Sequence, residues 1–192
     1  YLMKYDVATG LSERLTYGSH NVYLNDISPD GKKLLCSTSK PDITRCPFSL
    51  SSLFEIDLAT LQADTLVAWD AYLGSASYSP DGKQLLVTGS PSAFGGIGKN
   101  CGEHPIANDF DTQAFIMDLA TKKVQAITRD FNPTVSPVQW NRVDGCIYFD
   151  TTDGDCRHIY RYVLKTGGFE MLPLEEDVIT SFTLANDNPV VA

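Results

Sequence analysis

Apolar residues recur along the chain in short runs that are bounded by turn-forming residues. Three such runs lie at 34–36, 85–87 and 147–149. Two further runs, at 54–58 and 115–119, each end at an Ala-Thr pair. Short apolar runs between turns predict β-strands, and no stretch has the 3.6-residue period of an amphipathic helix. The pattern therefore predicts an all-β protein.

A turn signature repeats between these runs. Ser-Pro-Asp-Gly-Lys occurs at 28–32 and 79–83, with a weaker copy at 141–148 and a decayed copy at 185–191. Pro presets φ, Asp hydrogen-bonds its own backbone and Gly accepts a positive φ, so the signature predicts a tight turn between two strands. A second signature, built on Asp-x-Ala-Thr, occurs at 6–10, 57–60, 118–121 and, in altered form, 163–167.

The spacing of the two signatures divides each repeat into a constant half and a variable half. From the Thr of the second signature to the Asp of the next turn, the steps are 21, 21, 23 and 21 residues. From that Asp to the next Thr, the steps are 30, 40 and 22 residues. Insertions therefore fall in one half only, as expected for a rigid scaffold with variable loops.

A unit of this length with four antiparallel strands is typical of a β-propeller blade. We predict a partial β-propeller of about four four-stranded antiparallel blades, of which the first and last are incomplete. The expected blade fragments are about 1–17, 18–69, 70–129, 130–174 and 175–192. Since propellers close with about 4–8 blades, the chain is expected to be a segment of a larger propeller. Unpaired blade edges predict self-association.

Composition excludes several functional classes. The 192 residues include 24 acidic and 15 basic ones, which gives a net charge of −9. Nucleic-acid binding requires a basic face, so an acidic chain of this kind is not expected to bind nucleic acid. No apolar run approaches the roughly 20 residues that a membrane span needs. The sequence predicts no cofactor.

The phrase at 76–87, a Ser-Pro-Asp-Gly-Lys turn followed by an apolar strand, resembles the WD-like repeat of TolB-type propellers. Together with the long insertions, it more closely resembles the N-terminal propeller of the prolyl oligopeptidase and dipeptidyl peptidase IV family of serine peptidases. This resemblance implies a non-catalytic segment of a periplasmic or secreted exopeptidase, which gates and positions peptide substrate for a separate α/β-hydrolase domain. The alternative is a TolB-like periplasmic propeller that binds a protein partner and is no enzyme.

The resemblance also bears on the catalytic and substrate-binding residues. The family's nucleophile lies in a Gly-x-Ser-x-Gly turn followed by Asp and His, whereas the nearest string, at 74–78, lacks the second Gly. We therefore expect no catalytic set and no catalytic domain in this chain. In the dipeptidyl peptidases two glutamates on a propeller loop bind the substrate's amino terminus. Glu175 and Glu176 lie in the same kind of connection, and carboxylates suit an ammonium group. The aromatic neighbours and the helical insert of the family pattern are missing here, and the same pair is also ordinary in a solvated loop.

The five cysteines are too few, and odd in number, for a disulfide framework. Cys46 and Cys101 fall in the two insertions, 37–53 and 90–113, so a disulfide between them is conceivable in an oxidising compartment. Free thiols explain the same positions equally well. Counted outward from a turn at Asp153-Gly154, Cys156 is expected to face Thr151 across its hairpin, which disfavours a bridge to Cys146.

Metal ligation has weak support in the sequence. His104 lies near Glu103, Asp109 and Asp111, but no spacing matches a known zinc or calcium site. A polar loop is the ordinary explanation, and the sequence predicts no metal site.

Overall fold

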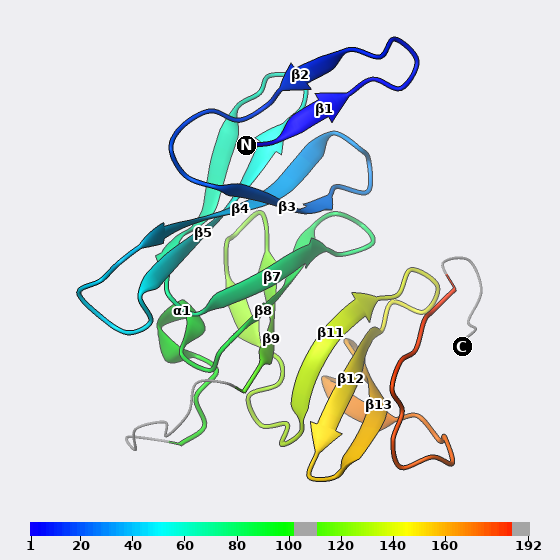
Figure 1. Ribbon diagram of the computed structural model, residues 1–192. Helices are drawn as coiled ribbons and strands as arrows, with labels where there is room; N and C mark the ends of the chain where they lie inside the picture. The colour runs from blue at the N-terminus through cyan, green and yellow to red at the C-terminus, as the bar shows by residue number, and fades with distance from the viewer. Residues whose placement is uncertain (102–110, 186–192) are drawn as a thin grey trace. The chain divides into compact units, whose positions relative to one another are not determined.

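The computed structural model describes residues 1–101 and 111–185, and these form an almost entirely β structure (Figure 1). The strands are β1 (Met3–Tyr5), β2 (Ser12–Arg14), β3 (Val22–Ile27), β4 (Lys33–Pro41), β5 (Ser49–Asp57), β6 (Ala63–Asp70), β7 (Leu73–Tyr78), β8 (Gln84–Gly89), β9 (Gln113–Asp118), β10 (Val124–Ala126), β11 (Thr134–Trp140), β12 (Ile147–Asp153), β13 (Cys156–Val163) and β14 (Gly168–Met171). Within these described ranges the single helix is α1 (Ala93–Gly96). Residues 103, 104 and 109 of the polar loop, and 186–191 of the decayed repeat, lie outside them.

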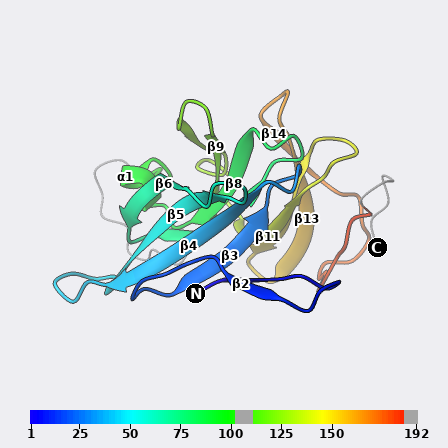
Figure 2. The same ribbon diagram turned by 90° about the horizontal axis from the view of Figure 1, so that it is seen from above.

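The strands form three four-stranded sheets and one two-stranded sheet within the described residues. The four-stranded sheets contain β3–β6, β7–β10 and β11–β14, and in each of them the strands are neighbours in chain order. Figure 2 shows β3, β4, β5 and β6 side by side in that order. The remaining sheet pairs β1 with β2. The predicted all-β fold of four-stranded antiparallel blades is confirmed.

Each Ser-Pro-Asp-Gly turn is closed by hydrogen bonds of its first residue. The backbone N–H of Ser28 donates to the carbonyl of Lys33 at 2.9 Å, and the Ser28 hydroxyl accepts from the N–H of Lys33 at 2.8 Å. That hydroxyl also donates to the Asp30 carboxylate at 2.7 Å. In the weaker copy Asn141 replaces Ser, and its side-chain oxygen accepts from the N–H of Val143 at 2.7 Å. The signature is therefore a structural turn.

The second signature is also a turn held by its own side chain. Asp57 accepts hydrogen bonds from the backbone N–H groups of Ala59 at 2.9 Å and Thr60 at 2.8 Å. These bonds lower the pKa of the Asp57 carboxyl, most strongly through the Thr60 N–H. The next residue, Leu61, has a φ of 57°, so the turn is tight enough to force a bulky residue into the left-handed region.

Gly31 and Gly82 are required by these turns, with φ of +71° and +69°. We expect each change to Ala to lower the free energy of unfolding by about 1–2 kcal/mol, because L-residues are disfavoured at positive φ. An added Cβ at Gly31 meets nothing within 4 Å, so that variant isolates the backbone cost. Urea unfolding measures the loss, and Gly31→Asn should lose less because Asn tolerates this region. Equal losses for Ala and Asn would contradict the explanation.

The insertion at 37–53 is mostly paired strand rather than the predicted loop. β4 continues to Pro41 and β5 begins at Ser49, and the ladder between them runs from Ser37↔Leu53 to Pro41↔Ser49. Only 42–48 forms the hairpin tip. The sequence hides this extension because the added residues of β4 are polar, so no apolar alternation marks them.

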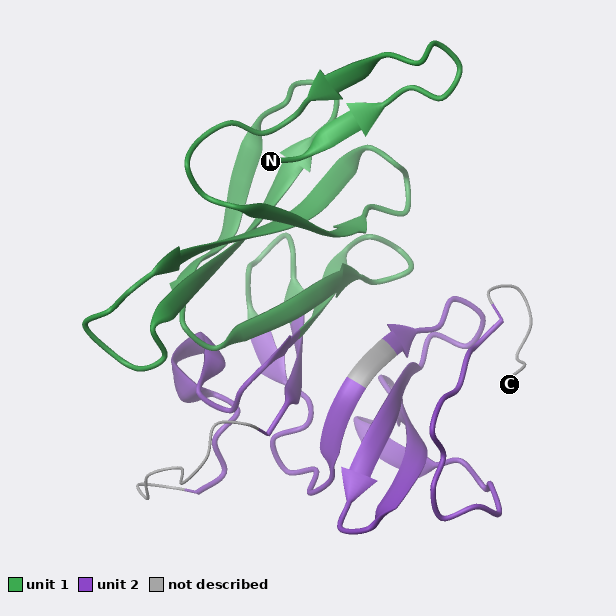
Figure 3. Ribbon diagram, in the orientation of Figure 1, with its two compact units in different colours: residues 1–87, 117–123 green, residues 88–116, 124–192 purple. Residues whose placement is uncertain are grey.

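The chain divides into two compact units, 1–87 with 117–123 and 88–116 with 124–192 (Figure 3). One core cluster of the first unit contains Leu34, Cys36 and Ile56, all buried. In the second unit Phe149 is fully buried, and its ring lies 5.6 Å from that of Phe169. Among residues 1–101 and 111–185, the structure contains no helix of the length and hydropathy that crossing a membrane would require.

Candidate functional site

The predicted glutamate pair lies in the connection that follows β14. Glu175 and Glu176 are both exposed. On one side of the pair the N–H of Leu172 donates to the carbonyl of Ile159 at 2.8 Å. On the other side the N–H of Arg157 donates to the carbonyl of Asp177 at 2.8 Å. The loop that carries the pair is therefore fixed at both ends to the same strand, β13.

The segment after the glutamates runs beside the start of β13. Arg157 and Val178 form a parallel bridge, and the N–H of Ile179 donates to the carbonyl of Arg157 at 3.0 Å. β14 ends at Met171, so this returning segment covers a part of β13 that β14 leaves unpaired. It brings Asp177 next to residues that precede it by about twenty positions in the sequence.

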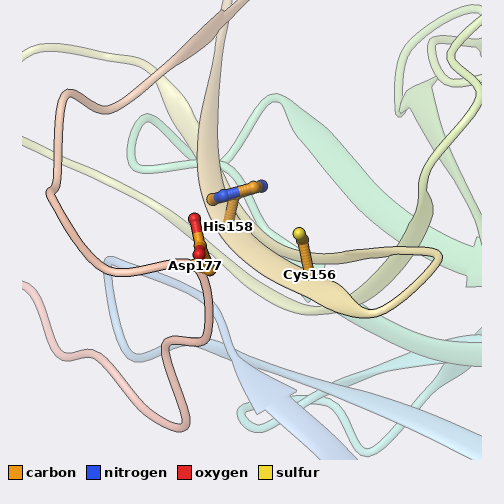
Figure 4. Close-up of side chains that lie close together, drawn as sticks. All are labelled: Cys156, His158 and Asp177. Atoms are coloured by element: carbon orange, nitrogen blue, oxygen red, sulfur yellow. The ribbon is translucent and has the colours of Figure 1, made fainter.

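Cys156, His158 and Asp177 come together at this place (Figure 4). Cys156 and His158 project from β13, and Asp177 projects from the returning segment. The Cys156 sulfur, one His158 ring nitrogen and one Asp177 carboxylate oxygen all lie within 4.8 Å of one another. Cys156 and His158 are half-buried, whereas Asp177 is exposed. The cluster is therefore open to solvent on the Asp177 side.

The surroundings of Cys156 are acidic. Desolvation, followed by the negative charge of Asp155, raises the pKa of the thiol, and Asp177 and Asp153 add to the effect. The Asp155 carboxylate oxygen lies 3.6 Å from the sulfur. A nucleophilic cysteine needs a lowered pKa and an electropositive environment. The cluster therefore does not suit a thiol nucleophile, although its negative field suits a bound cation.

Arg157 does not contribute its charge to the cluster. It lies between Cys156 and His158 in the sequence, so its side chain projects to the opposite face of β13. Its guanidinium forms an ion pair with the carboxylate of Asp150. The positive charge of Arg157 is therefore neutralised by Asp150, on the face of β13 that points away from the cluster.

A second candidate site is a groove of about 680 Å³ in the first unit, lined by the two Ser-Pro-Asp-Gly turns and the turn at 118–120. Glu55, on β5, is buried in it and accepts two hydrogen bonds. The Tyr78 hydroxyl donates to one carboxylate oxygen at 2.7 Å, and the Lys33 ammonium donates to the other at 2.9 Å. Burial and the bond to Glu55 raise the pKa of Tyr78.

The groove's other carboxylates serve the turns. Asp30 and Asp81 each accept from the hydroxyl of the turn serine, at 2.7 Å in both cases. That bond is the main cause of the lowered pKa of each carboxyl. Glu55 is likewise saturated by Lys33 and Tyr78, so these acids stabilise the fold rather than offer acid–base chemistry.

Sequence reasoning missed the cluster and misplaced one hairpin register. Cys156 faces Asp153, and His158 faces Thr151, so the expected pairing of Cys156 with Thr151 is wrong. The central turn residues are 154 and 155 rather than 153 and 154. A usable signal was present, because the Cys-x-His spacing places both side chains on one face of a strand. The position of Asp177 required the tertiary structure.

The sequence leaves two alternatives for Cys46 and Cys101, a disulfide or two free thiols. Cys46 lies in the first unit at the tip of the β4–β5 hairpin, and Cys101 lies in the second unit. Both alternatives stay open for these two cysteines.

No protein-family model and no curated protein sequence matches the chain. Solved structures do match. TolB from Acinetobacter baumannii matches with a TM-score of 0.63 and 20% identity, over 96% of this chain and 40% of that chain. The β-propeller domain of the Trilobed protease from Pyrococcus furiosus matches with a TM-score of 0.57 and 19% identity, over 95% of this chain and 50% of that chain. These matches show that the fold is of the β-propeller type.

An oligogalacturonate lyase in complex with manganese also matches, with a TM-score of 0.66 and 15% identity, over 88% of this chain and 46% of that chain. The chain thus spans half or less of the length of these three structures. At such low sequence identity, the structural matches support the fold and leave the activity open, because one fold hosts many functions. The structural neighbours include both TolB and a peptidase propeller, as the repeat signature led us to expect.

Proposed function

We propose that this chain is the non-catalytic propeller segment of a periplasmic or secreted serine exopeptidase of the dipeptidyl peptidase IV type. In this role it gates access and positions peptide substrate for a separate α/β-hydrolase domain. The supporting observation is the exposed Glu175-Glu176 pair on a loop that is hydrogen-bonded to β13 at both ends. The match to the Trilobed protease propeller supports the same role.

The loop geometry suits recognition of a peptide's free amino terminus. Two neighbouring carboxylates offer an ammonium group several charge-assisted hydrogen bonds. A loop anchored at Leu172 and Asp177 loses less conformational entropy on binding than a loop without such anchors. The pair is therefore expected to act in binding and orientation, while the chemistry takes place on the hydrolase domain.

The test uses the complete gene product and chromogenic Gly-Pro and Ala-Pro amide substrates. The double variant Glu175→Gln with Glu176→Gln should lower kcat/KM for these substrates about tenfold or more, the effect of losing one hydrogen bond to a charged group. The loss should appear mainly in KM, since the pair binds the ground state and the transition state alike. Glu13→Gln, which removes another exposed carboxylate, is the matched control.

An amino-acetylated substrate separates recognition of the ammonium group from general damage. The double variant should hydrolyse it at the same rate as the unaltered protein, because no ammonium is present. Equal losses on free and acetylated substrates would contradict the role of the pair. Activity that a serine-directed fluorophosphonate does not abolish would contradict the peptidase assignment.

A TolB-like propeller that binds a protein partner is the second candidate, favoured by the match to TolB over 96% of the chain. In that case the complete gene product should show neither amidase activity nor fluorophosphonate labelling. Self-association through unpaired blade edges stays a prediction for either function.

A further inference from the structure

We propose that Cys156, His158 and Asp177 bind one zinc ion. The site goes beyond the proposed function and does not depend on it, because the glutamates assigned to substrate are not among its ligands. It rests on the three side chains that meet where the returning segment passes β13 (Figure 4).

The donor set fits zinc. Thiolate sulfur, imidazole nitrogen and carboxylate oxygen are its ordinary protein ligands, and three protein ligands with an open fourth position are common. Tetrahedral coordination at the usual bond lengths requires donor atoms about 3.3–3.6 Å apart. The three atoms lie within 4.8 Å of one another, so their separations exceed the ligand spacing by no more than about 1.5 Å.

The backbone holds the two strand ligands in place. Cys156 pairs with Asp153 and His158 with Thr151 on one side of β13. The Thr151 hydroxyl also donates to the carbonyl of His158 at 3.0 Å. On the other side, bonds from Arg157 to Asp177 and from Ile179 to Arg157 fix the segment that carries the third ligand. The site is therefore assembled on paired backbone rather than on a loose loop.

Charge and ligand type decide which cation fits. Asp153 and Asp155 add negative charge around Cys156, while the Arg157 guanidinium is paired with Asp150. Calcium and magnesium prefer sites made only of oxygen ligands, whereas sulfur and imidazole select zinc and similar transition metals. Binding converts the Cys156 thiol to a thiolate, and the released proton passes to solvent.

The experiment titrates zinc into the reduced, metal-free full chain and counts bound metal by mass spectrometry. We expect one zinc per chain, retained in the presence of excess magnesium. Cobalt used in its place should produce a sulfur-to-cobalt charge-transfer band, because Cys156 supplies a thiolate ligand. A stoichiometry of zero, or a cobalt complex without that band, would overturn the proposal.

Variants of each ligand identify the site. Zinc binding should weaken by more than about tenfold in each of the variants Cys156→Ser, His158→Gln and Asp177→Asn. Loss of a ligand should cost at least as much as mutation of a residue that only hydrogen-bonds to a ligand, which typically lowers metal affinity 10–100-fold. Cys46→Ser and Glu13→Gln are the matched controls, an exposed cysteine and an exposed acid that both belong to the first unit, and should bind zinc normally. Unchanged affinity in any one of the three ligand variants would refute the assignment. The readout contains no peptide hydrolysis, so it is independent of the proposed peptidase role.

Discussion

Replacing Phe149 by Ala should lower the free energy of unfolding by about 3–5 kcal/mol, the usual cost of truncating a buried aromatic residue. Phe149 lies on β12 and has no exposed surface. Its ring lies 5.6 Å from Phe169, which stacks on Phe131 at 3.9 Å. The substitution therefore opens a cavity beside this stacked pair.

Urea unfolding followed by circular dichroism measures this loss. Phe48→Ala is the matched control, because Phe48 is 66% exposed at the β4–β5 hairpin tip and should cost less than about 0.5 kcal/mol. If Phe149→Ala does not fold, Phe149→Leu leaves a smaller cavity and should cost less than the alanine variant, though more than Phe48→Ala. Similar small losses at positions 48 and 149 would show that this cluster is not part of the core.

The repeat turns and the strands around them were predictable because their determinants are local. Ser28, Asp30 and Gly31 define a turn through bonds that span at most five residues. The same holds for Asp57 and the two N–H groups that follow it. Two such turns at constant spacing determine where four strands begin and end, so the all-β blade pattern follows from the sequence.

The charged clusters were not predictable because the residues that form each of them are distant from one another in the sequence. Tyr78 and Glu55 are 23 residues apart, and the N–H of Tyr78 also donates to Asp26, 52 residues away, at 2.8 Å. Asp177 reaches Cys156 only because the chain returns to β13 after leaving β14. Such contacts depend on strand order and loop path, which residue patterns do not encode.

The hairpin before Cys156 shows how a local ambiguity changes a site. Asp153-Gly154 and Gly154-Asp155 are both acceptable two-residue turns. The structure uses the second, with Gly154 at a φ of +63°. A shift of one residue in the turn changes the partner of every following residue by two positions, and this placed His158 opposite Thr151. Sequence alone could not choose between the two registers.

The free energy of unfolding should fall steeply above pH 9, by about 3–5 kcal/mol between pH 8 and pH 11. Burial raises the pKa of the Cys36 thiol from 9.0 to about 12. Burial, together with the bond to Glu55, raises the pKa of Tyr78 well above its usual 10.0. Burial and a 2.6 Å bond to Asp144 raise the pKa of Tyr148 to about 12.

The direction of this pH dependence follows from the number of protons that the folded and unfolded states bind. At a pH between the two pKa values of such a group, the folded protein keeps a proton that the unfolded chain has lost. The folded state therefore binds more protons, and stability decreases as pH rises, by about 1.4 kcal/mol per pH unit for each group. The contribution of each group to the free energy of unfolding is complete below pH 9 for Cys36 and below pH 10 for the two tyrosines. It is lost as the pH rises through the pKa of that group in the folded state.

Single variants separate the three contributions when urea unfolding is repeated at each pH in the presence of a reductant. Cys36→Ala should flatten the dependence between pH 9 and 10, because in that range only the Cys36 thiol titrates among the three groups. Tyr78→Phe should flatten it above pH 10, and it should also destabilise the protein at pH 7 by about 1.5–3 kcal/mol, since Glu55 then loses a hydrogen bond to a buried charge. Tyr148→Phe tests the contribution of Tyr148 to the pH dependence of stability, also above pH 10. Parallel curves for the unaltered protein and all three variants would contradict this account, because the slope would then come from groups outside these buried contacts.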